Sequence, residues 1–267
     1  DGSTVLASQM ESASVFEIDA ETFTVRRQLP TGGSWSKVIA LSPDGATLYV
    51  SNWSSNDVSE IDLATGEVRR VLPTVATPRG LYPAADGQRL FVAGFENGEL
   101  ARIELTDGTS ETLLQTGGAM RHLVGDAATG ALYANDMATN EVYVVDLATE
   151  AVRKLADTND KPNTTDLTPD GKVLYVSNRG ANNPESFYIP GPEWGSVLAI
   201  HTQSGAVLDG IVGGNQTTAL DVSPDGQYLA FSDFLDDRIQ VFEIPLSDEL
   251  IAGGGGRAQA HLAELAK

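Results

Sequence analysis

The chain has 267 residues, of which 41% are hydrophobic, so it can bury a sizeable core. Lys and Arg total 17 against 37 Asp and Glu, and the net charge of −20 repels phosphate backbones, which argues against nucleic-acid binding. No stretch approaches 18 consecutive apolar residues, which argues against a membrane span. Cysteine is absent, which excludes disulfides and thiolate chemistry and favours a periplasmic or extracellular protein.

One turn recurs along the whole chain, and such self-similarity indicates a repeat architecture. Each copy ends in glycine, which reaches the positive φ of a tight turn, and Pro or Asp often precedes it. Successive turn glycines are 43, 42, 43, 41 and 55 residues apart. The copies are Ser42–Gly45, Ala84–Gly87, Ala127–Gly130, Thr168–Gly171 and Ser223–Gly226, and Asp1–Gly2 has the form of a sixth.

Each repeat of about 42 residues contains four short runs with strand-like alternation. In one copy these runs are residues 37–41, 48–52, 58–62 and 68–73. Four short strands per repeat are typical of a propeller blade. We therefore predict an all-β, six-bladed β-propeller of four-stranded antiparallel blades over residues 1–245, with a seven-bladed ring or a β-sandwich as alternatives.

The strand count predicts that the first and last blades are incomplete in this chain. The sequence supplies five first, six second, six third and five fourth strands, which sum to 22, whereas six four-stranded blades need 24. A native segment of about 20 residues ahead of Asp1 would supply the two remaining strands in order. We therefore expect residues ahead of Asp1 to belong to the native protein.

Several repeat segments resemble a known family. Leu174–Asn178, and Val58–Asp62 followed by Thr65 and Gly66, resemble the repeat of the YVTN family of β-propellers, also described as lactonase-like or surface-layer-type propellers. The resemblance covers residues 1 to about 245 and implies the propeller fold. Because that family includes lactonases, haem-binding domains and surface proteins, the resemblance implies no single activity.

Residues 246–267 depart from the repeat. Glycines at 253–256 predict a flexible linker, and the Ala- and Leu-rich residues 257–267 predict a short helix, with no helix before about residue 256. A helix this short is marginal alone, so a frayed terminus is expected, and docking on the propeller or a partner is the alternative.

The start of each first strand surrounds the mouth of a propeller's central channel, the default ligand site of this fold. Alignment on the turn places Lys37, Arg79, Arg121, Asn163 and Thr218 there, and His122 follows Arg121. Converging cations in an acidic protein predict a pocket for a carboxylate, phosphate or sulfate group. The alternative is that each cation pairs locally or is solvated.

The ends of the second strands add polar residues on the same side of the blades. The oxygens of the Asn and Asp among them suit a hard cation such as Ca²⁺, but Asn and Asp equally suit turns in which they satisfy their own backbone, so no metal is predicted. The residues are Asn52, Trp53, Gly94, Asp136, Asn178, Arg179 and Asp233.

The 55-residue spacing reflects an insertion at residues 181–194, which lengthens a loop on the mouth side. Three prolines stiffen it, and Phe187, Tyr188 and Trp194 give it aromatic surface. Long ordered loops are often functional, so Tyr188 and Trp194 are candidate ligand or partner contacts. Packing across the mouth without a ligand is the alternative.

Two function classes remain. The first is a binding module for a small anion or a protein partner. The second is a lactonase-type hydrolase of an acidic substrate, in which His122, Asp136 or Asp233 would activate water. No Gly-x-Ser-x-Gly elbow occurs, and His122 alone is poor support for zinc or haem, so the cofactor stays unknown. The Asp that ends a third strand (Asp19, Asp62 or Asp146) is expected to cap a turn, and His201 and His261 are not catalytic candidates.

Overall fold

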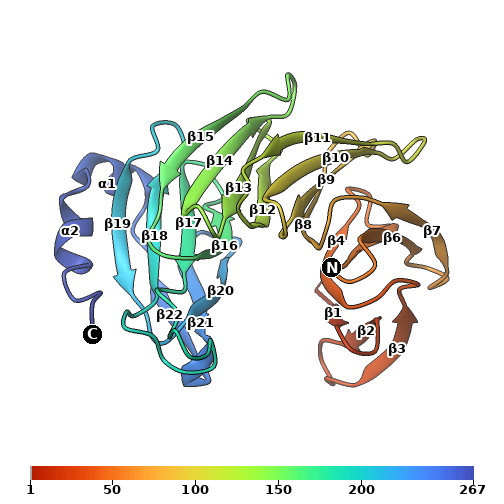
Figure 1. The fold of residues 1–267 in the computed structure, drawn as a ribbon, viewed down its shortest axis with the longest axis horizontal. Coiled ribbons are helices and arrows are strands. Elements are labelled where there is room, and N and C mark those ends of the chain that lie inside the picture. The colour runs from red at the N-terminus through yellow and green to blue at the C-terminus, as the bar shows by residue number, and fades with distance from the viewer. Residues whose placement is uncertain (1) are drawn as a thin grey trace. The chain divides into compact units, whose positions relative to one another are not determined.

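The computed structural model describes residues 2–267, and within them the protein is a six-bladed all-β propeller (Figure 1). Four blades are four-stranded antiparallel sheets, and the first and last have three strands each. The predicted architecture is confirmed, and the seven-bladed and sandwich alternatives are wrong. The chain divides into two compact units, Asp1–Met120 and Arg121–Lys267.

The first unit holds blades 1 to 3. Blade 1 is β1 (Thr4–Gln9), β2 (Ser14–Asp19) and β3 (Val25–Pro30). Blade 2 is β4 (Ser36–Leu41), β5 (Thr47–Asn52), β6 (Asp57–Asp62) and β7 (Val68–Pro73). Blade 3 is β8 (Pro78–Pro83), β9 (Arg89–Gly94), β10 (Glu99–Glu104) and β11 (Ser110–Gln115).

The second unit holds blades 4 to 6 and the helices. Blade 4 is β12 (Met120–Asp126), β13 (Ala131–Asp136), β14 (Glu141–Asp146) and β15 (Val152–Asp157). Blade 5 is β16 (Pro162–Leu167), β17 (Val173–Asn178), β18 (Ser196–His201) and β19 (Val207–Val212). Blade 6 is β20 (Thr217–Val222), β21 (Tyr228–Asp233) and β22 (Arg238–Glu243), with η1 (Phe234–Asp236) between its last two strands. The helices α1 (Ser247–Gly253) and α2 (Gly256–His261) follow.

The repeated turn forms as predicted. Its six glycines, Gly2 included, have φ between 66° and 75°, a region that favours glycine. In the copy at 42–45, the Asp44 carboxylate accepts hydrogen bonds from the Ala46 amide (3.0 Å) and the Ser42 hydroxyl (2.5 Å). These turns set the strand spacing, and the alternating strands bury their apolar faces between neighbouring blades, as in the cluster of Tyr49 and Val58 with Val92 and Ile103. Of the sixth turn, Asp1 lies outside the described residues.

The acidic residue that ends a third strand caps the next turn, as predicted. Asp62 Oδ1 accepts the Thr65 amide at 2.9 Å, and Asp146 Oδ1 accepts the Thr149 amide at 2.8 Å. These backbone hydrogen bonds hold the pKa of both carboxyls below the usual range. In blade 5, His201 takes this position and its Nδ1 lies 2.8 Å from Ser204 Oγ, so it too serves the turn.

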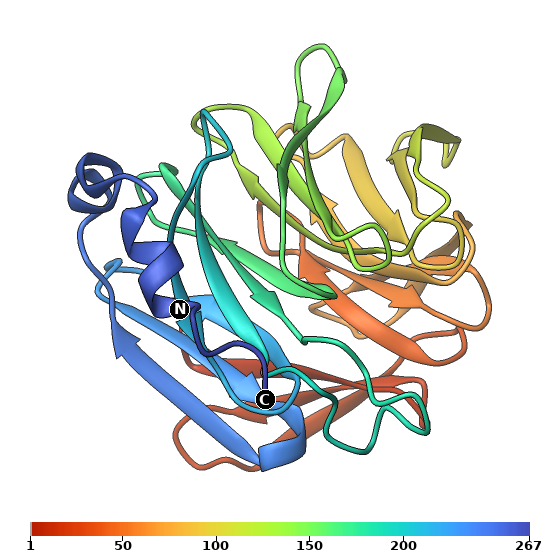
Figure 2. The same ribbon diagram turned by 60° about the vertical axis from the view of Figure 1, so that its left-hand side comes forward.

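The C-terminal segment contains more helix than the sequence predicted. Helix begins at Ser247, so the expectation of no helix before about residue 256 is wrong, because Leu250 is buried in the core cluster of blades 5 and 6. Figure 2 shows both helices beside the blade that contains β19, and α2 contacts that strand. Asp209 of β19 accepts Arg257 Nε at 3.1 Å and His261 Nδ1 at 2.6 Å. Among residues 2–267, no helix is long and apolar enough to cross a membrane.

Candidate functional site

The first strand of several blades begins with a bulge. The pairing of β4 with β5 shifts register between Ser36 and Ile39, and β8, β16 and β20 shift at the same place. A bulge re-aims a side chain and is common beside functional sites. In blades 2 to 6 we call the second residue of the first strand the second-residue position. Its members are Lys37, Arg79, Arg121, Asn163 and Thr218.

A side chain from the second strand stabilises this bulge. Ser51 Oγ accepts the amide of Val38 at 3.0 Å and donates to the carbonyl of Arg79 in the next blade at 2.9 Å. Ser177 repeats the arrangement, accepting the Thr164 amide at 3.0 Å and donating to the Thr218 carbonyl. These serines satisfy a backbone amide that the ladder leaves unpaired and fix the second-residue position of the following blade.

In blades 2 and 3 the predicted cations meet an aromatic cluster. The Lys37 ammonium lies 5.1 Å from the centre of the Trp53 ring, and the Arg79 guanidinium lies 5.5 Å from it. Phe95 packs on Trp53 with ring centres 5.0 Å apart and also contacts Arg79. Trp35 adds a half-exposed ring 5.9 Å from Lys37. Lys37, Arg79 and Trp53 are therefore brought together as one cation–π cluster.

In blade 4 the cation at the second-residue position contacts a methionine sulfur and not an aromatic ring. Arg121 Nη1 lies 3.3 Å from the sulfur of Met137, the residue directly after β13. The adjacent His122 has its Nδ1 3.4 Å from the Thr165 amide and 3.3 Å from the Thr165 hydroxyl. Since the amide can only donate, Nδ1 accepts this hydrogen bond.

In blade 5 the cation lies after the second strand and not at the second-residue position. Here the second-residue position holds Asn163, and the cation is Arg179, directly after β17. Arg179 donates from Nη2 to the Gln216 side-chain oxygen, its Nε is buried without an acceptor, and no described carboxylate pairs with it. Burial lowers the pKa of this guanidinium. The Nδ2 of Asn163 is also buried without an acceptor.

The insertion at 181–194 reaches the same region. Gln216 donates from Nε2 to the carbonyl of Phe187, which links the loop to Arg179. The rings of Phe187 and Tyr188 are 4.0 Å apart, Tyr188 lies 6.3 Å from Phe234, and all three are exposed. Trp194 has a different role, because the Lys267 ammonium lies 4.3 Å over its ring and its amide donates to the Leu265 carbonyl. The C-terminus thus fixes one end of the insertion.

Most polar side chains at the ends of the second strands bond within their own blades, and the exception is Asn178, whose Oδ1 is buried without a hydrogen-bond partner. Asn52, Asp136, Asn178 and Asp233 are all at most 1% exposed. Asp233, for example, accepts the Gly214 amide, the Thr217 hydroxyl and both Arg238 and Gln240. Asn52 bonds to Ser36, Asp57 and Ser59, and Asp136 accepts two turn amides. Across the part of the chain that the structure describes, no three His, Asp or Glu gather as metal ligands.

Sequence reasoning missed the residue just before each first strand. In blades 2, 3, 5 and 6 this residue has positive φ, between 47° and 61°, whereas Ala119 of blade 4 does not; the four residues are Trp35, Thr77, Lys161 and Gln216. The left-handed backbone at this place recurs in these four blades. The signal is in the sequence, two residues ahead of each second-residue position, but only the fold shows that Trp35 joins Lys37 and that Gln216 joins Arg179.

Comparison with known proteins agrees with this architecture. The model of the YNCE-like β-propeller family matches residues 2–235. Antigen Lp49 of Leptospira interrogans serogroup Icterohaemorrhagiae serovar copenhageni (strain Fiocruz L1-130) is 38% identical over 243 residues. That match takes in 88% of this chain and 53% of the relative, so the chain spans about half the length of that protein.

Two solved structures share the fold. Hydrazine synthase of Kuenenia stuttgartiensis superposes with a TM-score of 0.76 at 20% identity, over 100% of this chain and 83% of that one. A Bacteroides uniformis ATCC 8492 protein, proposed to be a 6-phosphogluconolactonase, has a TM-score of 0.71 at 19% identity, over 91% and 78% of the two chains. At these identities the similarity concerns the fold alone.

Proposed function

We propose that this chain, which belongs to the YNCE-like β-propeller family, is a non-catalytic binding module that holds a small anionic ligand at Arg179. One observation carries the proposal. The Arg179 side chain is partly buried, its Nε is buried without an acceptor, and it pairs with no carboxylate within residues 2–267. A desolvated cation is costly unless an anion approaches it, so the site favours an anion.

The other arginines make the contrast clear. Although the protein carries 37 acidic residues, no ion pair joins Arg179 to an Asp or Glu among residues 2–267. Eight arginines form ion pairs with Asp or Glu, and these are Arg26, Arg27, Arg69, Arg70, Arg89, Arg102, Arg238 and Arg257.

The surroundings of Arg179 suggest the chemical class of the ligand. A guanidinium has five N–H donors, which match the paired oxygens of a carboxylate or phosphate. The exposed rings of Phe187, Tyr188 and Phe234 offer contact to a flat or apolar body. A small organic acid suits both features, whereas a large polyanion would be repelled by the net charge of −20.

Calorimetric titration with acetate, benzoate, inorganic phosphate and 6-phosphogluconate tests the proposal. We expect one of these acids to bind the wild type and Arg179→Gln to weaken that binding by more than about tenfold, since hydrogen bonds to charged groups are lost. Arg153→Gln is the matched control, because Arg153 is an exposed arginine of the same unit that touches only a backbone carbonyl. If none of the acids binds, or if binding survives Arg179→Gln, the proposal is wrong.

A double variant separates Arg179 from the cations at the second-residue position. We expect Arg79→Ala with Arg121→Ala to leave binding within about threefold, because these cations already contact Trp53, Phe95 and Met137. Loss of binding in the double variant, with retention in Arg179→Gln, would contradict the assignment of the ligand to Arg179.

A lactonase-type hydrolase is the second candidate. The Bacteroides uniformis protein and the imidazole of His122 favour it. Hydrolysis of δ-gluconolactone or its 6-phosphate by the purified protein, lost in His122→Ala, would support this candidate over a binding module.

A location outside the cytoplasm fits the comparisons. The relative from Leptospira interrogans is named an antigen. We infer a periplasmic or extracellular protein. Fractionation of the source cells, with detection by an antibody to the chain, tests this inference.

A further inference from the structure

A second donor without a partner lies in the same blade as Arg179. The Nδ2 of Asn163 is buried without an acceptor among the described residues, as is the Nε of Arg179, and Asn163 is only 4% exposed. A buried donor that lacks an acceptor costs free energy, and most buried donors in native proteins are paired. Two such donors in blade 5 therefore point to an acceptor that binds between them.

The repeat places these two side chains next to each other. In blades 2 to 4 the side chain at the second-residue position contacts the residue directly after the second strand of the same blade. The three pairs are Lys37 with Trp53 at 5.1 Å, Arg79 with Phe95 at 5.8 Å, and Arg121 with Met137 at 3.3 Å. Asn163 and Arg179 hold the same two positions in blade 5, where the Arg179 amide donates to the Lys161 carbonyl at 3.0 Å. The two donors are therefore placed to share one acid group.

Charge and donor number restrict the kind of acid. Arg179 supplies one positive charge, and Asn163 supplies a neutral donor. A carboxylate carries one negative charge on two oxygens, so it balances this charge and gives each donor one oxygen. A phosphate monoester carries about −1.5 to −2 charges at pH 7 on three oxygens, so part of its charge and one oxygen would stay unpaired in a partly buried site.

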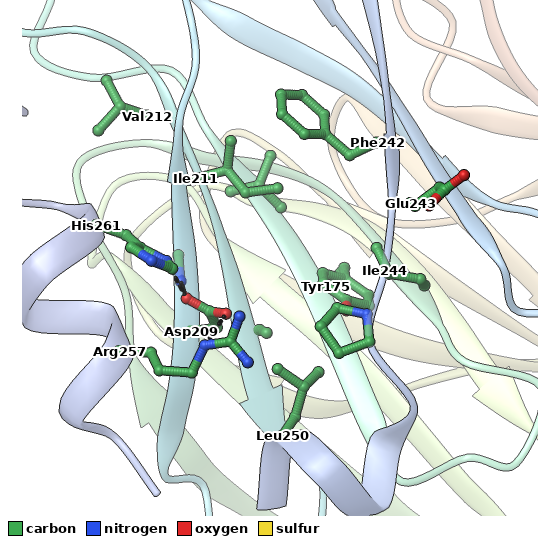
Figure 3. A pocket seen from close by; sticks show the side chains of 14 residues that line it. Tyr175, Asp209, Ile211, Val212, Phe242, Glu243, Ile244, Leu250, Arg257 and His261 are labelled. Carbon is green, nitrogen blue, oxygen red and sulfur yellow. Dashed lines mark hydrogen bonds and ion pairs between the residues drawn. The ribbon is translucent and has the colours of Figure 1, made fainter. Parts of the chain in front are cut away.

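The apolar cavity of about 410 Å³ in the same unit is a poorer site for an acid. Figure 3 shows Asp209 and Glu243 in its lining, and both carboxylates repel an anion. Its two basic side chains, Arg257 and His261, already bond to Asp209 at 3.1 Å and 2.6 Å. Arg257 is therefore a paired arginine beside a cavity and serves as a control for Arg179.

We propose that Asn163 and Arg179 together form a site for a monocarboxylate, and that Asn163 selects the carboxylate over a phosphate monoester. This proposal rests on the proposed function, which assigns the anion to Arg179. One carboxylate oxygen accepts a hydrogen bond from Arg179 Nε, and the other accepts one from Asn163 Nδ2. Asn163 is thus the specificity-determining residue of the site.

A segment must move to admit the acid, because both donor atoms are covered. The insertion at 181–194 is that segment, since Gln216 joins Arg179 to the Phe187 carbonyl. Its last residues are held by the C-terminus, because the Lys267 amide donates to the Pro192 carbonyl at 3.0 Å. The part of the insertion around Phe187 therefore opens for the acid, while residues 192–194 stay in place.

Calorimetric titration with benzoate and phenyl phosphate tests the selection, because these acids share one ring and differ in the acid group. We expect the wild type to bind benzoate at least about tenfold more tightly than phenyl phosphate. Asn163→Leu keeps the side-chain volume and removes the donor, so it should weaken benzoate binding by about tenfold. Gln203→Leu, which removes an exposed amide after β18, and Arg257→Gln are the controls and should bind benzoate as the wild type does.

Asn163→Lys should shift the preference toward phosphate. Blade 2 has a lysine at the same position, Lys37, so the fold accommodates this side chain. The second positive charge balances a phosphate monoester, and phenyl phosphate should bind at least about tenfold more tightly than it binds the wild type, whereas benzoate should gain less. A merely structural role of Asn163 would weaken the binding of both acids alike.

Failure of this proposal is distinguishable from failure of the proposed function. If phenyl phosphate binds the wild type as tightly as benzoate does, and Arg179→Gln loses both acids, the anion site stands but the selection by Asn163 is wrong. Benzoate binding that survives Asn163→Leu, or that is lost in Arg257→Gln, also overturns the proposal. If neither acid binds the wild type, the proposal is wrong, and the proposed function is wrong too when acetate, phosphate and 6-phosphogluconate also fail to bind.

Discussion

Blades 2 and 5 carry the same kinds of group at the same two positions, but in opposite order. In blade 2 the cation Lys37 lies in the bulge, and Trp53 follows the second strand. In blade 5 Asn163 lies in the bulge, and the cation Arg179 follows the second strand. The first cation has a ring to contact, whereas the second has one amide oxygen. The repeated turns, bulges and serines fix these two positions in both blades. The residue types that occupy them decide what each position can bind.

The largest effect is expected when the aromatic partner is removed from blade 2. Trp53→Ala should lower the free energy of unfolding by about 2–3 kcal/mol, because the ring packs on Phe95 and contacts two cations. Urea denaturation measures the change. Trp35→Ala, which removes a half-exposed ring, is the control and should cost less than about 1 kcal/mol. Equal losses in both variants would contradict the central role of Trp53.

The shared framework predicts that blades 2 and 5 respond alike to loss of the bulge serine. Ser51→Ala and Ser177→Ala should each cost about 1–2 kcal/mol, because each leaves a backbone amide and the next blade's carbonyl without a partner. Ser204→Ala, at an exposed turn, is the control. A large difference between Ser51 and Ser177 would show that the two bulges are not equivalent.

The fold was predictable because its signals are local. The turn glycines, the alternating strands and the turn-capping Asp62 and Asp146 all act within one repeat, so spacing alone reveals them. The C-terminal helix was misjudged because burial of Leu250 against blade 5 outweighs the effect of the glycines at 253–256.

The candidate site was only partly predictable. The sequence identifies Lys37 and Arg79 as cations of an anion pocket and Arg179 only as one of the polar residues at the ends of the second strands. Their difference depends on contacts between blades and loops, such as Gln216 with Arg179 and with the Phe187 carbonyl. Asn52 and Asp233 were chosen for their oxygens, but burial within their own blades uses those oxygens, which no spacing reveals.

Replacing the cation by Met should raise the free energy of unfolding in blade 5 but not in blade 2. Arg179→Met should raise the free energy of unfolding in ligand-free buffer by about 1 kcal/mol, because it removes a buried charge that has no counter-ion and keeps the apolar volume. Lys37→Met should leave stability unchanged or slightly lower it, because it loses contact with two rings. Urea denaturation of both variants at low salt makes the comparison, and destabilisation by Arg179→Met would contradict an uncompensated charge.

The smallest expected effect is on the pH dependence of stability, which should differ between blade 5 and blade 2. Asp166 of β16 is partly buried, and burial, with the neighbouring Asp221 carboxyl adding to it, raises its pKa to about 6 from 3.8. The fifth residue of β4 is Ala40, so blade 2 has no equivalent group. Since the folded state binds this proton more tightly than the unfolded chain, its contribution is complete below pH 4 and is lost as the pH rises through 6.

Asp166→Asn should therefore be more stable than the wild type at pH 7, by no more than about 1 kcal/mol because the site is partly solvated, and the difference should shrink or reverse at pH 4. The other carboxyls, such as Asp62, lose stability as pH falls, but they do so equally in both proteins and cancel in the difference. Thermal unfolding of the pair at pH 4, 5, 6 and 7 gives this difference directly. A difference that does not vary with pH would mean that Asp166 titrates alike in the folded and unfolded chains, and that its burial beside Asp221 carries no electrostatic cost.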